Sequence, residues 1–149
     1  MDRTRQIETF FEQYAARVNQ ALQDPPVVDV DGAVANFADC FIEASPNGVI
    51  RGKNDEQFRE VIPQGFAFYK SISTTAMNVA GVDVTPLDEL HAMARVHGDS
   101  RYRRQDGEEI RIEFDVIYFV QVRDRQPKIF AYVTGDEQQV LRDHGLLPE

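Results

Sequence analysis

Apolar and polar residues alternate along the stretch from Glu108 to Arg123, EEIRIEFDVIYFVQVR. Every even position from Ile110 to Val122 is apolar, whereas most of the odd positions are polar. A period of two over this length predicts a strand with one buried face. Because the stretch is much longer than a mean strand of about five or six residues, we expect it to bend and to form the centre of a sheet.

Helical periodicity marks the N-terminal part of the chain. Apolar residues recur at spacings of three and four over residues 4–22, which predicts an amphipathic helix with Thr4 as its N-cap. The sequence Asp24-Pro25-Pro26 ends this helix. We expect Asp31 to cap a short second helix.

A third helix is predicted over residues 53–71, with Asn54 as its cap and an apolar stripe that ends at Tyr69. Pro63 and Gly65 interrupt the pattern, so we expect a kink or a break between them.

The pattern after the third helix changes to a run of strands. Strands are predicted at 73–84, 89–103, 108–123 and 128–134, and a short helix within 135–144 closes the chain. Residues 41–52 are also extended, with a turn at Ser45-Pro46-Asn47-Gly48. Helices followed by antiparallel strands predict an α+β fold, in one domain spanning residues 1–149, with helices on one face of the sheet.

The hairpin at Gln105-Asp106-Gly107 leaves two strand registers open. A two- or four-residue loop places His97 opposite Val116 and Arg95 opposite Tyr118, so that His97, Arg95 and Tyr118 share the helix-covered face. A three-residue loop with a bulge instead places Leu90, Ala92, Ala94 and Val96 on that face. The second register pairs apolar residues with apolar residues, and the sequence does not decide between the two.

The net charge, the N-terminal segment and the single cysteine predict the partners, the location and the thiol environment of the protein. The formal net charge is −9, so nucleic acid and anionic membrane surfaces are unfavourable partners. The N-terminus does not resemble a signal peptide and no apolar run reaches the roughly 20 residues that span a bilayer, so we expect a cytoplasmic protein. Cys40, the single cysteine, lies among apolar residues, which favours a buried and unreactive thiol.

Three segments carry a family resemblance. They are Tyr14 in QYAARVNQ, the segment AVANFADCFIEASPNGVIRG at 33–52, and the strand pair joined near Gly107. Together with three helices and a bent sheet, they resemble the nuclear transport factor 2-like superfamily, which includes scytalone dehydratase, ketosteroid isomerase and the SnoaL-like polyketide cyclases. The resemblance covers nearly the whole chain. It implies a cone-shaped, cystatin-like fold in which three N-terminal helices wrap a bent antiparallel sheet, with a pocket between helices and sheet.

The implied pocket would hold a small apolar ligand. The residues expected to line it are Tyr14, Phe37, Phe41, Phe66, Met93, Phe114, Val116 and Tyr118. The resemblance also implies catalytic candidates: Tyr14 matches the position of the oxyanion-donating tyrosine of the isomerases, and Tyr118 falls near their second donor. Ser45, before Pro46, replaces their aspartate base, and an unassisted serine is a poor proton acceptor at neutral pH. We therefore discount the isomerase reaction itself.

The histidines complete the set of candidates. His91 and His97 lie six residues apart on one strand, about 20 Å in distance, which is too far to share a metal. His97 and Asp99 share a strand face and could form a dyad, or His97 could be a strand-end residue near solvent. With Arg95, His97 joins Tyr14 and Tyr118 as a catalytic candidate. We expect no metal and no cofactor, because no nucleotide-binding or metal-ligand motif is present.

Three functions follow as hypotheses. The first is a small-molecule-binding protein with an apolar pocket, the second an enzyme of cyclase, dehydratase or isomerase type, and the third a protein-interaction module. A homodimer is also expected, through an outer-face strip of Ile117, Phe119, Val96, Ala94 and Ala92 in the first register. The alternative cover for this strip is the C-terminal segment 136–149, with Val140, Leu141, Leu146 and Leu147.

Overall fold

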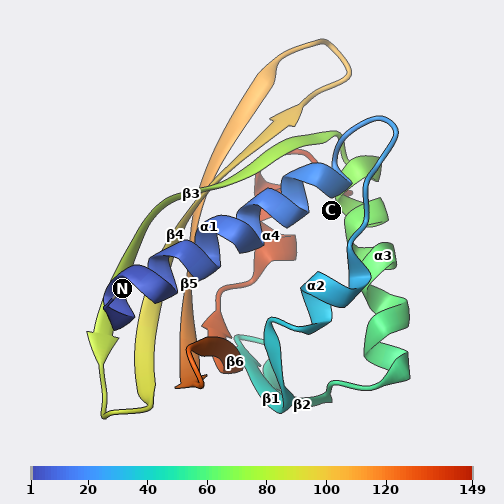
Figure 1. Cartoon of the computed structure of the whole chain (residues 1–149). Coiled ribbons are helices and arrows are strands. Elements are labelled where there is room, and N and C mark those ends of the chain that lie inside the picture. Colours follow the sequence, from blue (N-terminus) through green and yellow to red (C-terminus); the bar gives the residue numbers. More distant parts are fainter. Residues whose placement is uncertain (1, 149) are drawn as a thin grey trace.

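The computed structural model describes residues 2–148, so residues 1 and 149 of the expected domain lie outside it. Four helices and one six-stranded sheet make up the fold (Figure 1). The helices are α1 (Arg3–Ala21), α2 (Val30–Val34), α3 (Glu56–Ser71) and α4 (Glu137–Asp143). The strands are β1 (Phe37–Ser45), β2 (Gly48–Lys53), β3 (Thr74–Pro86), β4 (His91–Arg103), β5 (Glu109–Arg123) and β6 (Gln126–Thr134). The α+β fold predicted from the sequence is confirmed.

The helices begin at aspartates rather than at the residues expected from the sequence. The side chain of Asp2 caps α1 in place of Thr4, Asp29 caps α2 in place of Asp31, and Asp55 caps α3 in place of Asn54. In each helix the aspartate accepts a hydrogen bond from the backbone N–H three residues later, which satisfies one of the free donors of the first turn.

Pro63 lies inside α3 without interrupting it, so the expected break is absent. Pro63 is exposed, and water can therefore reach the backbone carbonyl that loses its helical partner there. The side chain of Asn54 instead donates to the carbonyl oxygens of Val34 and Phe37, which fastens the start of α3 to the α2–β1 connection.

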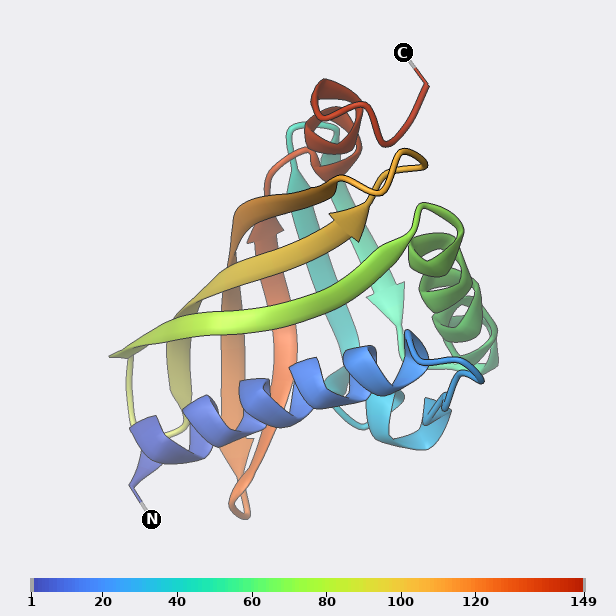
Figure 2. The same cartoon turned by 90° about the horizontal axis from the view of Figure 1, so that it is seen from above.

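The sheet has the order β2-β1-β6-β5-β4-β3 and is open at both edges. Strands β3 to β6 form the expected antiparallel meander, whereas β1 adds to β6 in parallel. The sheet is strongly bent, and α1, α2 and α3 lie on its inner side (Figure 2). The expectation that β5 is the centre of a bent sheet is confirmed.

The hairpin between β4 and β5 adopts the second of the two registers. Gln105, Asp106 and Gly107 form a three-residue loop that is closed by a hydrogen bond from the Arg104 N–H to the Glu108 carbonyl, and Gly107 has a φ of 88°. A glycine tolerates this left-handed conformation without steric cost. Ala94 therefore lies opposite Tyr118 and Arg95 lies opposite Ile117, so the first register is wrong.

The register decides which face each residue of β4 occupies. Ala92 and Ala94 are fully buried beneath α1, and Val96 is 7% exposed. Their small side chains let Ile7 and Phe11 of α1 approach the sheet closely. The alanines consequently lie on the inner face and cannot belong to the outer strip that the first register gave them.

Cys40 is exposed, which corrects the expectation of a buried thiol. Phe41 points into the core from β1. Because successive side chains of a strand point to opposite faces, the adjacent Cys40 points away from it.

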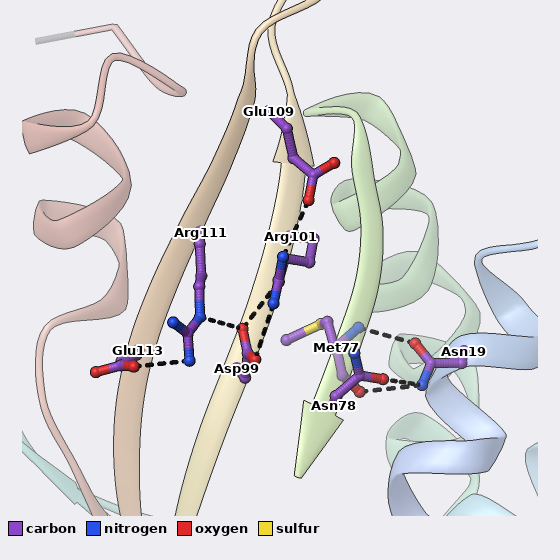
Figure 3. A network of polar contacts seen from close by, with 8 residues as sticks. All are labelled: Asn19, Met77, Asn78, Asp99, Arg101, Glu109, Arg111 and Glu113. Atoms are coloured by element: carbon purple, nitrogen blue, oxygen red, sulfur yellow. Dashed lines mark hydrogen bonds and ion pairs between the residues drawn. The ribbon is translucent and has the colours of Figure 1, made fainter. Parts of the chain in front are cut away.

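A polar network ties together the outer face of β4 and β5 (Figure 3). Asp99 accepts hydrogen bonds from Arg101 at 3.0 and 3.3 Å and from Arg111 at 3.1 Å. Arg101 and Arg111 are direct cross-strand partners, so the Asp99 carboxylate separates two like charges. The two guanidinium groups hold the pKa of Asp99 below its usual range.

Replacing Asp99 with alanine is expected to lower the midpoint of thermal unfolding at pH 7 by a few degrees, because Arg101 and Arg111 then face each other without the carboxylate that they share. Each arginine keeps one other acidic partner, Glu109 for Arg101 and Glu113 for Arg111. The contribution of Asp99 is present above the ordinary carboxyl pKa and is lost as pH falls through its lowered folded pKa, so the difference between the two proteins should shrink in acid. Glu113→Ala is the control, since Glu113 is exposed and contacts Arg111 alone in this network. Equal effects of the two substitutions would contradict the interpretation.

Candidate functional site

A cavity of about 230 Å³ lies between the helices and the inner face of the sheet. On one side it borders the main core, to which Phe11 of α1 and Val96 of β4 both belong. On the other side it borders a second apolar cluster, in which Leu141 of α4 packs with Tyr102 and Ile112. The cavity is thus the space between two separately packed clusters.

The hollow has a local cause in the sequence of β4. Continuing along the inner face from Val96, the next two inward positions are Gly98 and Ser100, which have little or no side chain. A Cβ at Gly98 would lie 2.8 Å from the backbone oxygen of Phe114, so glycine also permits the close approach of β4 and β5 at this point. Helix α3 contributes Phe66 and Tyr69 to the cavity wall but has no fully buried side chain, so it does not fill the space.

Tyrosines from four elements line this cavity. Tyr14 comes from α1, Tyr69 from α3, Tyr102 from β4 and Tyr118 from β5. The ring centroids of Tyr14 and Tyr118 lie 6.3 Å apart, and the Tyr118 centroid lies 4.8 Å from that of Phe11. Burial raises the pKa of all four phenols, so they remain protonated donors at neutral pH.

Glu137, the first residue of α4, supplies a carboxylate to the same cavity. The Tyr69 hydroxyl donates a hydrogen bond of 2.6 Å to its Oε1 atom. Burial raises the pKa of Glu137, and the bond from Tyr69 offsets part of that rise. Among the described residues that line the cavity there is no lysine, arginine or histidine, so Glu137 has no cationic partner there.

A wider, open hollow of about 450 Å³ shares Tyr14, Tyr69, Tyr118 and Glu137 with the cavity. It extends toward the β1–β2 turn and the start of α4. The residues added there include Phe37, Glu43, Ser45, Tyr132 and Asp136. Because the two hollows share four polar side chains, we describe the wider one as the mouth of the cavity.

Some of the residues predicted to line the pocket do line the cavity, and others lie elsewhere in the structure. Five of them line the cavity, namely Tyr14, Phe66, Phe114, Val116 and Tyr118. Phe37 lines the mouth, and Phe41 packs in the core with its ring 4.9 Å from Phe37 and 5.0 Å from Phe58. Met93 lies opposite Phe119 on the outer face, so its assignment to the pocket is wrong for the same reason as the first register.

His97 and Arg95 also lie on the outer face, away from Tyr14 and Tyr118. The His97 ring lies between Asp83 on β3, at 2.8 Å, and Asp115 on β5, at 3.0 Å, and Arg95 lies 3.6 Å from Asp115. These two carboxylates raise the pKa of His97. The four catalytic candidates therefore do not meet in one cavity, and the expected pair of His97 with Asp99 is replaced by pairs with Asp83 and Asp115.

Glu137 and Tyr69 were not among the residues predicted to form the site. Tyr69 lies on the apolar stripe of the third helix, which the sequence did reveal, but only the packing of α3 against α4 gives its hydroxyl a carboxylate partner. Glu137 is 68 positions away along the chain from Tyr69. Nothing in the local pattern around Glu137 distinguishes it from an ordinary acidic residue in the first turn of a helix.

Within residues 2–148, no helix is both long and apolar enough to cross a membrane.

Comparison with solved structures supports the fold. An NTF2-like protein with a cystatin-like fold from Novosphingobium aromaticivorans aligns with a TM-score of 0.65 and 12% identity, covering 98% of this chain and 89% of that chain. A ketosteroid isomerase-like protein from Erwinia carotovora atroseptica aligns with a TM-score of 0.58 and 13% identity, covering 87% and 92%. A putative calcium/calmodulin dependent protein kinase II association domain from Xanthomonas campestris gives 0.62 and 13%, covering 91% and 88%. At these identities the likeness concerns the fold alone.

No curated protein matches the sequence. A family model described as NTF2-like protein (DUF6841) matches residues 4–137, which include all six strands, the tyrosines of the cavity and Glu137. The chain therefore belongs to this NTF2-like family.

Proposed function

We propose that this protein binds a small, largely apolar molecule in the cavity between α1, α3 and the sheet. The observation that carries the proposal is a preformed hollow of about 230 Å³ with mostly apolar walls and a few convergent polar groups. A protein interior is ordinarily packed without such voids, and leaving one empty costs stability. A ligand that fills the cavity would recover the lost contacts.

The test uses two tryptophan substitutions one residue apart on α1. Ala15 lines the cavity, whereas Ala16 is exposed. Ala15→Trp is expected to fill the cavity and to weaken the binding of the neutral probe 1-naphthalenemethanol at least about tenfold, while Ala16→Trp leaves it unchanged. Titration calorimetry measures both. Equal binding of the probe to the two variants would overturn the proposal, as would an unmodified protein that binds neither this probe nor its charged naphthyl analogues.

An enzymatic reaction in the same cavity is the second candidate function. It is supported by Glu137, whose raised pKa suits a general acid or base, and by the hydroxyls of Tyr14 and Tyr118 as hydrogen-bond donors to a developing oxyanion. His97 and Arg95 play no part in this version, because they lie on the other face of the sheet. If the reaction is of cyclase, dehydratase or isomerase type, Glu137→Gln is expected to abolish it and Tyr14→Phe only to weaken it. Steady-state kinetics with a substrate that the unmodified protein converts would measure both effects.

We also propose a homodimer through the outer face of the sheet, with a composition that differs from the expected strip. Ile117 and Phe119 remain on this face, and Met93 replaces the alanines. Residues on β6 and β1 extend it: Ala131, Val133, Ile42 and Ala44. Ile42 is 40% and Val133 is 45% exposed, and an uncovered apolar surface of this kind favours association.

A cytoplasmic location of the protein remains a prediction from the sequence.

The C-terminal segment does not supply the alternative cover for this face. Leu141, Val140, Leu146 and Leu147 pack against Tyr102, Ile110 and Ile112, whose side chains point to the inner side of the sheet. Residue 149 of that segment lies outside the described residues. The apolar outer face therefore has no cover from α4 or from the residues described after it.

A further inference from the structure

The chemistry of the cavity wall restricts which ligand it can accept. Of the side chains that line the cavity and its mouth among the described residues, three are acidic and none is basic: Glu43, Asp136 and Glu137. Five tyrosines, Tyr14, Tyr69, Tyr102, Tyr118 and Tyr132, line the same surfaces. Aromatic faces and carboxylates both attract a cation, whereas an anion finds no positive partner there.

We propose that the cavity selects organic amines in their protonated form, with the ammonium group on Glu137 and the apolar part between the aromatic side chains. This inference rests on the proposed binding function and names the ligand class for that site.

Glu137 is the group positioned to receive the ammonium. Its Oε1 atom already accepts the Tyr69 hydroxyl, and among the described residues the other carboxylate oxygen has no hydrogen-bond partner in the protein. A carboxylate in a partly dehydrated site is stabilised strongly by a charged donor. An alcohol could donate to the same oxygen, but without the charge it would gain less.

The aromatic groups supply the second part of the recognition. Tyr14 and Tyr118 have their ring centroids 6.3 Å apart, and Tyr118 and Tyr132 have theirs 5.8 Å apart, so the three rings form a continuous wall from the cavity to its mouth. A cation within about 6 Å of such a ring is attracted by the negative face of the π system. The raised pKa values of these phenols keep them neutral, so they contribute ring faces and hydroxyls but no charge.

Long-range electrostatics act in the same direction. The whole chain carries a formal net charge of −9. At moderate ionic strength this charge favours the approach of cationic ligands and disfavours anionic ones.

The test compares three ligands that share one ring system: 1-naphthylmethylamine, 1-naphthalenemethanol and 1-naphthoate. At pH 7.5 the amine is expected to bind at least about tenfold more tightly than the alcohol, and the carboxylate is expected to bind most weakly. Titration calorimetry with the full chain measures all three. Equal affinities for amine and alcohol, or a preference for 1-naphthoate, would overturn the inference while leaving the binding proposal intact; no binding of any of the three would overturn both.

Glu137→Gln assigns the preference to one residue. Glutamine keeps the size and an acceptor for Tyr69 but removes the charge, so the roughly tenfold ratio of amine affinity to alcohol affinity should fall to about one in this variant. Glu43→Gln is the matched control at the mouth, where a smaller loss is expected because Glu43 does not line the inner cavity. An amine preference that survives in Glu137→Gln would show that Glu137 is not the recognition group.

A pH series gives an independent readout. The amine stays protonated across pH 5–8. The four tyrosines of the inner cavity stay neutral because their pKa values are raised, so Glu137 is the titratable group there that changes charge among the described residues. Because burial raises its pKa, the preference for the amine should fall as the solution is acidified through that pKa. The alcohol should show no such trend, and a preference that is independent of pH would contradict the assignment.

Discussion

Replacing Phe11 with alanine is expected to lower the free energy of unfolding by about 3–5 kcal/mol. Phe11 is 1% exposed, and its ring packs 5.0 Å from Phe10 and 4.8 Å from Tyr118. The substitution removes the closer of the two aromatic contacts that α1 makes with Tyr118 of β5, and a rigid neighbourhood cannot close the space that remains. Domains of this size have a total stability of about 5–15 kcal/mol, so the loss is a large part of the whole.

Urea unfolding followed by circular dichroism measures this change. Glu12→Ala is the matched control, because Glu12 is the next residue of α1 and is exposed, with a single contact to Arg5. Its expected effect is below about 0.5 kcal/mol. A loss of less than 1 kcal/mol for Phe11→Ala would mean that α1 is not packed on the sheet as described.

The same substitution should also affect the cavity. Phe11 supports the Tyr118 ring from the core side and lines the cavity beside it. In Phe11→Ala the ring gains room to move, and binding of 1-naphthalenemethanol should weaken even at a temperature where the variant remains folded.

Replacing Phe119 with aspartate is expected to dissociate the proposed dimer, raising its dissociation constant at least about a hundredfold. Phe119 lies in the middle of the apolar outer face, opposite Met93 and Ala131, and its ring is 6.2 Å from Phe130. A carboxylate at this position would have to lose its water in the interface without gaining a partner, which costs several kcal/mol.

Sedimentation velocity at micromolar concentration distinguishes the two states. The unmodified protein should sediment as a species with twice the 17.0 kDa mass of one chain. The Phe119→Asp variant should sediment as a single chain of 17.0 kDa. Val133→Asp tests the same surface without disturbing packing within the chain, since Val133 is 45% exposed. Unmodified protein that remains monomeric, or a Val133→Asp protein that remains dimeric, would contradict the proposed interface.

The sequence determined the elements and the fold class of this protein because those depend on local patterns. The alternation from Ile110 to Val122 predicts β5 with its correct inner face, and the three- and four-residue spacing of the N-terminal part predicts α1. The helix caps were off by one or two residues because several capping residues lie close together, as Asp29 and Asp31 do. Tyr14, Phe66, Phe114, Val116 and Tyr118 were found because they lie on faces that this periodicity defines.

Only the tertiary structure decided the register of β4 against β5 and the residues that depend on it. One residue more or less in the loop at Gly107 turns every side chain of β4 to the other face, and the length of a turn is set by its closing hydrogen bonds rather than by hydrophobic pattern. For this reason the outer face carries His97, Arg95 and Met93, which the first register placed on the inner face. Glu137 joined the cavity because α4 packs against α3 and the inner side of the sheet, and a contact between positions so far apart in the chain leaves no trace in the local sequence around either one.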